Sequence, residues 1–193
     1  MSILPKDQTE QASPQKTRSV RELGSVDISA IQKEILALPH YFWKAQNEAK
    51  PNQFEALGRT EHIVFQFVQD YNNHLDVVNY PLWEDWKDKI QPILEATIKP
   101  YGYEWGEFSR IMLAKLPPQG KISLHIDPYE SSNYTHKIHI PIQTNSDVEF
   151  WVDRKRYHFL EGHAYEVNNK ALHGGINRGN TDRINLIFEY YER

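Results

Sequence analysis

Downstream of Gly106 the chain is a succession of short β-favouring stretches separated by turn residues, with no helical stretch among them. A Pro-Pro-Gln-Gly cluster at 117–120 is typical of these turns. The predicted strands are residues 108–116, 121–126, 135–143, 148–152, 156–160, 163–167 and 183–191. So many short strands at close spacing predict a mainly β fold, an antiparallel sandwich or barrel.

The first hundred residues have a different character. Residues 1–24 are rich in Gln, Ser, Lys and Pro, which predicts a flexible N-terminal arm, or a segment that wraps the surface, and not a folding unit. Apolar residues at helical spacing from Ile28 predict a first helix that Asp27 caps and Pro39 ends. Residues 61–68 predict a strand.

A second helix is predicted to begin near Pro81, a favourable first-turn position, and to end at Pro100 and Gly102. Pro92 lies inside it and is expected to kink or split it. Both helices would pack on the outside of the strands. We therefore predict a single domain at residues 25–193, with helical support at about 25–104 and a β core at about 105–193.

Charge and composition limit the kinds of molecule that this chain can bind and the compartment in which it is expected. The chain has 22 basic and 26 acidic residues, a net charge of -4, so it lacks the positive field that nucleic acid or an anionic membrane would require. It has no cysteine, which excludes disulfides, thiolate ligands and a cysteine nucleophile. No apolar run approaches the ~18–20 residues of a membrane span. The first 26 residues do not resemble a signal peptide, so we expect a cytoplasmic protein.

His125 and Asp127 are separated by one residue at the end of a predicted strand. Because strand side chains alternate between faces, the imidazole and the carboxylate project from the same side and can share one metal ion. A third ligand must come from elsewhere, and His173, followed by two glycines that let the backbone turn, is the best candidate. Two histidines and one carboxylate with open positions opposite form the ligand set of non-haem Fe(II) oxygenases.

Arg183 begins the last predicted strand, ten residues after His173, with Asn185 on the same face. An arginine that enters so apolar a strand calls for an anion, and its planar fork suits a carboxylate. Taken singly, each element has an ordinary explanation: a chance His-x-Asp spacing, a structural histidine, or an arginine paired with one of the chain's own acids. Their order across an all-strand segment is more specific than any one of them.

Residues 105–191 resemble the aspartyl/asparaginyl β-hydroxylase-like branch of the 2-oxoglutarate oxygenases, which includes small hydroxylases of free proline. The segments that carry the resemblance are LHIDP, HKIHIPI, GHAYEVNN, LHGGINRG and DRINLIFEY, in this order. The resemblance implies a double-stranded β-helix (jelly-roll, cupin-like) supported by the N-terminal α-helices. It also implies Fe(II) on His125, Asp127 and His173, and the distal carboxylate of 2-oxoglutarate on Arg183.

In HKIHIPI, Lys137 and His139 share a strand face, and the resemblance places both beside the cosubstrate. The family usually has Arg where this chain has Lys137, and lysine is a point charge rather than a fork. From the residues alone, Lys137 is equally well a solvated strand residue and His139 a core histidine. Some family members that act on proteins lack the carboxylate ligand. Because this chain keeps Asp127, it resembles the small-molecule and microbial members more closely.

The resemblance implies an enzyme, an Fe(II)- and 2-oxoglutarate-dependent dioxygenase that uses O2. Its expected product is a hydroxylated amino-acid side chain, on a free amino acid such as proline or on Asp or Asn in a peptide, with succinate and CO2 as coproducts. One alternative is a non-catalytic β-barrel of the same fold that binds a ligand or a protein. Another is a cupin-type metal-dependent isomerase or hydrolase, in which Arg183 would have no task.

Overall fold

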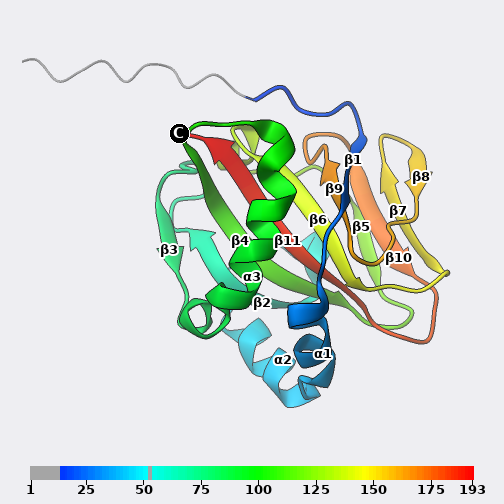
Figure 1. The fold of residues 1–193 in the computed structure, drawn as a ribbon. Helices are drawn as coiled ribbons and strands as arrows, with labels where there is room; N and C mark the ends of the chain where they lie inside the picture. Colours follow the sequence, from blue (N-terminus) through cyan, green and yellow to red (C-terminus); the bar gives the residue numbers. More distant parts are fainter. Residues whose placement is uncertain (1–13, 52–53) are drawn as a thin grey trace, which may run out of the picture.

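The computed structural model describes residues 14–51 and 54–193, which form two antiparallel β-sheets packed face to face with helices on the outside (Figure 1). The large sheet contains, in order across it, β1 (Val20–Ser25), β9 (His163–Val167), β6 (His136–Gln143), β11 (Arg183–Glu192), β4 (Gly106–Leu116), β2 (Glu61–Val68) and β3 (Val77–Asn79). The small sheet contains β5 (Lys121–His125), β10 (His173–Asn177), β7 (Val148–Val152) and β8 (Lys155–Tyr157). The predicted mainly β, jelly-roll fold is confirmed.

The helices are α1 (Ser29–Ala37), α2 (His40–Glu48) and α3 (Leu82–Ile98), and α3 lies across the outer face of the large sheet (Figure 1). Their apolar faces and that outer face form the main core. Its most buried members are Ile31, Ile35, Ile63, Phe65, Ile90, Leu94, Ile111, Leu113, Ile138, Ile140, Ile142, Ala164, Leu186 and Phe188. Because strand residues alternate, the polar neighbours Lys137 and His139 on β6 face the small sheet, where a pocket lies between the two sheets.

Several elements begin and end where the sequence predicts them. Strands β2, β7 and β9 have the predicted bounds, and α3 begins one residue after Pro81. The predicted cap Asp27 is one residue too early, since Ile28 is the N-cap of α1 and has no side-chain cap bond, but the side chain of Asp27 accepts a hydrogen bond of 2.9 Å from the backbone N–H of Ser29. Gly102, with φ of 65°, follows the short 3-10 turn that ends the α3 region.

Pro92 was expected to kink or split the second helix, and it does not split it, because α3 runs through it without a break from Leu82 to Ile98. A proline removes one backbone hydrogen bond from a helix interior. Four large buried side chains, two before Pro92 and two after it, hold the helix against the sheet. Their burial outweighs the missing hydrogen bond. They are Trp86, Ile90, Ile93 and Leu94.

The sequence did not reveal every element, and α2 and β3 are among those it missed. Only Trp43 is buried in α2, whose remaining residues are mostly polar, so the periodic apolar signal is weak. Strand β3 has three residues and lies at the edge of the large sheet, where pairing with β2 alone defines it.

The predicted arm at residues 1–24 needs correction at its C-terminal end. Residues 1–13 lie outside the described residues, but Val20–Ser25 is β1, which pairs antiparallel with β9. The large sheet therefore begins at residue 20, before the predicted domain boundary at residue 25. Backbone pairing at a sheet edge needs no apolar pattern, which is why the polar composition did not reveal it.

Strand β10 was also not predicted, and the two glycines after His173 lie inside it instead of forming a turn. A Cβ on Gly174 would lie 2.8 Å from the carbonyl oxygen of Ile122 and 3.1 Å from that of Ser123. Glycine is required here because backbone atoms of β5, which cannot move aside, occupy that space. The close approach brings β10 against β5 at the position of both histidines.

None of the helices in the described part of the chain has the length and apolarity needed to cross a membrane.

Candidate active site

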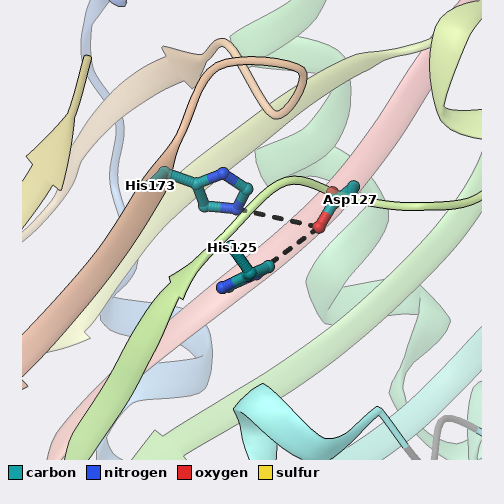
Figure 2. Close-up of side chains that lie close together, drawn as sticks. All are labelled: His125, Asp127 and His173. Atoms are coloured by element: carbon teal, nitrogen blue, oxygen red, sulfur yellow. Dashed lines mark ion pairs between the residues drawn. The ribbon is translucent and has the colours of Figure 1, made fainter.

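His125 and His173 lie directly opposite each other in the pairing of β5 with β10, and Asp127 follows the end of β5 (Figure 2). The backbone N–H of Asp127 donates to the carbonyl oxygen of Asn169 at 3.0 Å, which fixes the chain just beyond the strand. Oδ1 of Asp127 lies 3.6 Å from Nε2 of His125 and 3.7 Å from Nε2 of His173. One atom from each residue lies within 4.8 Å of the others, so the three side chains could hold one metal ion.

Both imidazoles are oriented by the backbone. Nδ1 of His125 lies 2.7 Å from the carbonyl oxygen of Ser123, and Nδ1 of His173 lies 3.0 Å from that of Ala171. A carbonyl oxygen only accepts, so each Nδ1 carries a proton, and Nε2 is the ring nitrogen left to face a metal. Burial lowers the pKa of His173 to about 4, so its ring is neutral at physiological pH. Two imidazoles and one carboxylate suit Fe(II).

Asp127 is held as an anion. Its Oδ2 accepts hydrogen bonds from Nζ of Lys137 at 2.6 Å and from Nδ2 of Asn169 at 3.1 Å. Burial alone would raise the pKa of Asp127, but the Lys137 ammonium, together with His125 and His173, outweighs it and holds that pKa well below its usual range. Oδ1 is therefore ionised and directed toward the imidazoles.

Lys16 lies behind Asn169, in the segment predicted to be an arm. Its Nζ donates to Oδ1 of Asn169 at 2.9 Å, to the carbonyl oxygen of Ser132 at 2.7 Å and to that of Thr135. Burial lowers the pKa of Lys16 to about 8. Lys16 thus joins the pocket wall at Ser132 to the side chain that holds Asp127. An isolated lysine in a polar stretch gave no sign of this in the sequence.

Arg183 lines the same pocket as the His-Asp-His group. It is 4 % exposed, and its guanidinium lies 5.7 Å from the ring centre of Phe150. No carboxylate of the described residues forms an ion pair with it, so the alternative of an internal partner does not apply to this part of the chain. Burial lowers the pKa of Arg183 to about 10, which leaves it charged at neutral pH.

His139 lies beside this arginine in the pocket wall. Its Nδ1 faces Nδ2 of Asn185 at 3.3 Å, so the amide donates and the imidazole proton is on Nε2. Nε2 has no hydrogen-bond partner among the described residues. Burial and the Arg183 charge hold the pKa of His139 well below its usual range, so the ring is neutral. A buried donor without a partner beside an unpaired guanidinium fits a carboxylate ligand such as 2-oxoglutarate.

Arg110 and Glu189 also line the pocket, and sequence reasoning missed both. Arg110 is on β4 and Glu189 is its Cα partner on β11. The signal that singled out Arg183, a charged residue inside an apolar strand, also applies to FSRIMLAKL and RINLIFEYY, where these residues lie.

Non-haem iron oxygenases of the 2-oxoglutarate-dependent class combine this two-sheet fold with two imidazoles and one carboxylate, and they leave part of the metal's surroundings open. The chain is of that class. The family described as aspartyl/asparaginyl beta-hydroxylase matches residues 27–193, so the chain belongs to this family. The predicted family and the predicted enzyme class are confirmed, and the non-catalytic and cupin-type alternatives are set aside.

Solved structures with this fold have low sequence identity to the chain. A 2OG-Fe(II) oxygenase family oxidoreductase from Burkholderia pseudomallei has a TM-score of 0.53 at 14 % identity, over 86 % of this chain and 91 % of that one. The viral collagen prolyl hydroxylase of Paramecium Bursaria Chlorella virus-1, in its 2OG complex, has a TM-score of 0.52 at 10 % identity, over 91 % of this chain and 97 % of that one. A Pseudomonas putida prolyl-4-hydroxylase has a TM-score of 0.52 at 8 % identity, over 92 % of this chain and 94 % of that one. No curated protein sequence matches the chain significantly.

Proposed function

We propose that this protein is an Fe(II)- and 2-oxoglutarate-dependent dioxygenase that hydroxylates the side chain of an amino acid. The observation that carries the proposal is one pocket that holds a His-Asp-His group at one place and, at another, a buried arginine with no ion-pair partner among the described residues. A structural histidine cluster would not require the second feature.

His125, Asp127 and His173 would hold the iron, and Arg183 would bind the distal carboxylate of 2-oxoglutarate through its planar fork. His139 would donate its Nε2 proton to an oxygen of the cosubstrate, since that proton lacks a protein acceptor among the described residues. Lys137 would act through Asp127, which it keeps ionised and oriented. The pocket's apolar wall, formed by side chains such as Met112 and Ile187, would exclude water from the reacting carbon.

When bound, Fe(II) supplies the activation of O2 that an amino-acid side chain cannot provide. The overall reaction replaces one substrate C–H bond with C–OH. One oxygen atom of O2 enters the product, and the other enters the succinate that forms as 2-oxoglutarate loses CO2. Atoms and electrons balance without a further reductant.

The names of two related structures, a collagen prolyl hydroxylase and a prolyl-4-hydroxylase, support an amino-acid side chain as the substrate class. Those substrates are properties of the named proteins. For this chain we propose a free amino acid or a residue in a peptide.

The proposal is tested by adding Fe(II) and 2-oxoglutarate to the purified protein without oxygen. We expect a weak visible charge-transfer band in the wild type and its loss in Asp127→Ala and His173→Ala, with substrate-stimulated succinate release lost in the same variants. His158→Ala is the matched control, because His158 is an exposed histidine that does not line the pocket. If a correctly folded Asp127→Ala or His173→Ala variant kept the band and wild-type turnover, the proposal would be wrong.

A further inference from the structure

A pair of opposite charges is buried at one end of the pocket. Nη1 of Arg110 donates to Oε2 of Glu189, and the two side chains are 5 % and 3 % exposed. Removing both charges from water is costly, and a buried ion pair is often no more stable than an apolar pair of the same size. A pair that lines a ligand pocket therefore points to a role toward the ligand.

The pair lies well away from Arg183 along β11. Arg183 and Glu189 share a face of β11, six residues apart, which corresponds to about 20 Å along a strand. Between them, the ring of Phe150 lies near both Arg183 and His173, and Lys137, the Cα partner of Glu189, reaches Asp127. A 2-oxoglutarate molecule anchored on Arg183 and the metal cannot span that distance. The Arg110 end is left for the primary substrate.

The hydrogen bonds of the pair leave room for a ligand. Oε2 of Glu189 accepts from Arg110 and from Oγ1 of Thr135 at 2.9 Å, whereas Oε1 has no donor among the described residues. Nη2 of Arg110 donates to Oγ of Ser131 at 2.7 Å, and the guanidinium lies 5.0 Å from the ring centre of Phe67. Both charges are thus fixed in place and adjacent.

We propose that Arg110 and Glu189 bind the head group of a free α-amino acid, with its ammonium on Oε1 of Glu189 and its carboxylate on Arg110. This inference rests on the proposed function and narrows its substrate. The ammonium and carboxylate of a zwitterion lie a few bonds apart, and the two charges of the pair are adjacent. Each charge of the zwitterion would therefore meet the opposite charge on the protein. An internal residue of a peptide carries neither charge, so it would offer no counterpart to either member of the pair.

The other charged residues of the pocket indicate what kind of side chain the substrate carries. Among the described residues that line it, Asp127 and Lys137 pair with each other and Arg183 faces the cosubstrate. No charged group is left for the substrate's side chain, and the lining positions next to the pair on β4 and β11 are the apolar Met112 and Ile187. The substrate is therefore a free amino acid with an uncharged side chain.

The first test compares each proteinogenic L-amino acid as the free zwitterion and as its N-acetyl methylamide, with succinate release as the readout. We expect at least one uncharged free amino acid to stimulate release roughly tenfold more than its blocked form, the loss expected for charge-assisted hydrogen bonds. Blocked forms that stimulate as well as the free ones overturn the inference. So does the absence of stimulation by any free amino acid when the anaerobic Fe(II)–2-oxoglutarate band is present, and the proposed function then stands. Absence of the band overturns the proposed function and the inference with it.

The second test uses Glu189→Gln and Arg110→Lys with the best free amino acid. For Glu189→Gln we expect the preference for the free over the N-acetylated form, as a ratio of kcat/KM values, to fall roughly tenfold. A ratio within one variant is unaffected by a general loss of active protein. Glu61→Gln is the matched control, because it breaks the ion pair of Glu61 with Lys115 on β4, which does not line this pocket. An unchanged ratio in both folded pocket variants overturns the assignment.

Discussion

Lys137 on β6 donates a hydrogen bond of 2.6 Å to Oδ2 of Asp127, while Oδ1 of the same carboxylate faces the two imidazoles. The lysine therefore contacts a candidate metal ligand and not a free anion. A compact ammonium satisfies one carboxylate oxygen and leaves the other available. An arginine at this position would engage two oxygens with its fork. Lys137 engages only one oxygen of Asp127, which suits a residue that supports this carboxylate.

Lys137→Met should shift metal binding to higher pH. The ammonium lowers the pKa of Asp127, and without it burial would raise that pKa, so protons would compete with the metal at higher pH. We expect the midpoint of Co2+ binding against pH to rise by roughly one to three units. Spectroscopic Co2+ titration checks this, with Lys155→Met on exposed β8 as the control. An unchanged midpoint would mean that Lys137 does not support the ligand.

Arg183→Met should raise the apparent KM for 2-oxoglutarate by roughly 10- to 100-fold, because a bidentate charge-assisted contact is lost. Arg183→Lys should recover only part of the loss, since lysine offers a point charge. Arg178→Met, a change at an exposed arginine nearby, should have no effect. Steady-state kinetics with varied 2-oxoglutarate measure the three variants, and an unaltered KM in Arg183→Met would remove this residue from the cosubstrate site.

Lys16→Met should weaken metal binding roughly tenfold, as expected for a group that orients a ligand through Asn169. It should also lower the free energy of unfolding of the metal-free protein by about 1–3 kcal/mol, because the carbonyls of Ser132 and Thr135 lose their donor. Arg18→Met, in the same segment, is the control. Loss of stability with unchanged Co2+ affinity would limit Lys16 to a structural role.

His62 should make the fold sensitive to acid. It is 2 % exposed, and burial, with the charges of Lys50 and Lys137, lowers its pKa to about 3. Below the unfolded value of about 6.5, the unfolded chain binds a proton that the folded protein does not, so stability falls as pH falls. Between neutral pH and pH ~5.5 this loss is about 1.4 kcal/mol.

Urea unfolding at the two pH values tests this in wild type and His62→Gln. The variant should lose about 1.4 kcal/mol less than the wild type on acidification, since glutamine does not titrate. His158→Gln, a change at an exposed histidine, should behave as wild type. If wild type and His62→Gln lose equal stability, the acid sensitivity comes from other groups.

Local patterns in the sequence were sufficient for much of the fold. Alternation along a strand placed His125 and Asp127 on one side, and period-two and helical spacing gave β2, β7, β9 and the start of α3. These signals are local because each side chain's direction depends only on its own element. The same reasoning drew attention to Arg183, since a cation inside an apolar strand needs an anion wherever the strand packs.

Other features depended on which element lies opposite. The approach of β10 to β5 explains Gly174, and the pairing of β4 with β11 brings Arg110 to Glu189. The burial of Lys16 behind Asn169 follows from β1 joining the edge of the large sheet. Sequence periodicity determines which face of its own strand a residue occupies. Only the pairing of strands in the folded sheets decides which distant backbone and which opposite charge that face meets, because those contacts join residues whose separation along the chain carries no periodic signal.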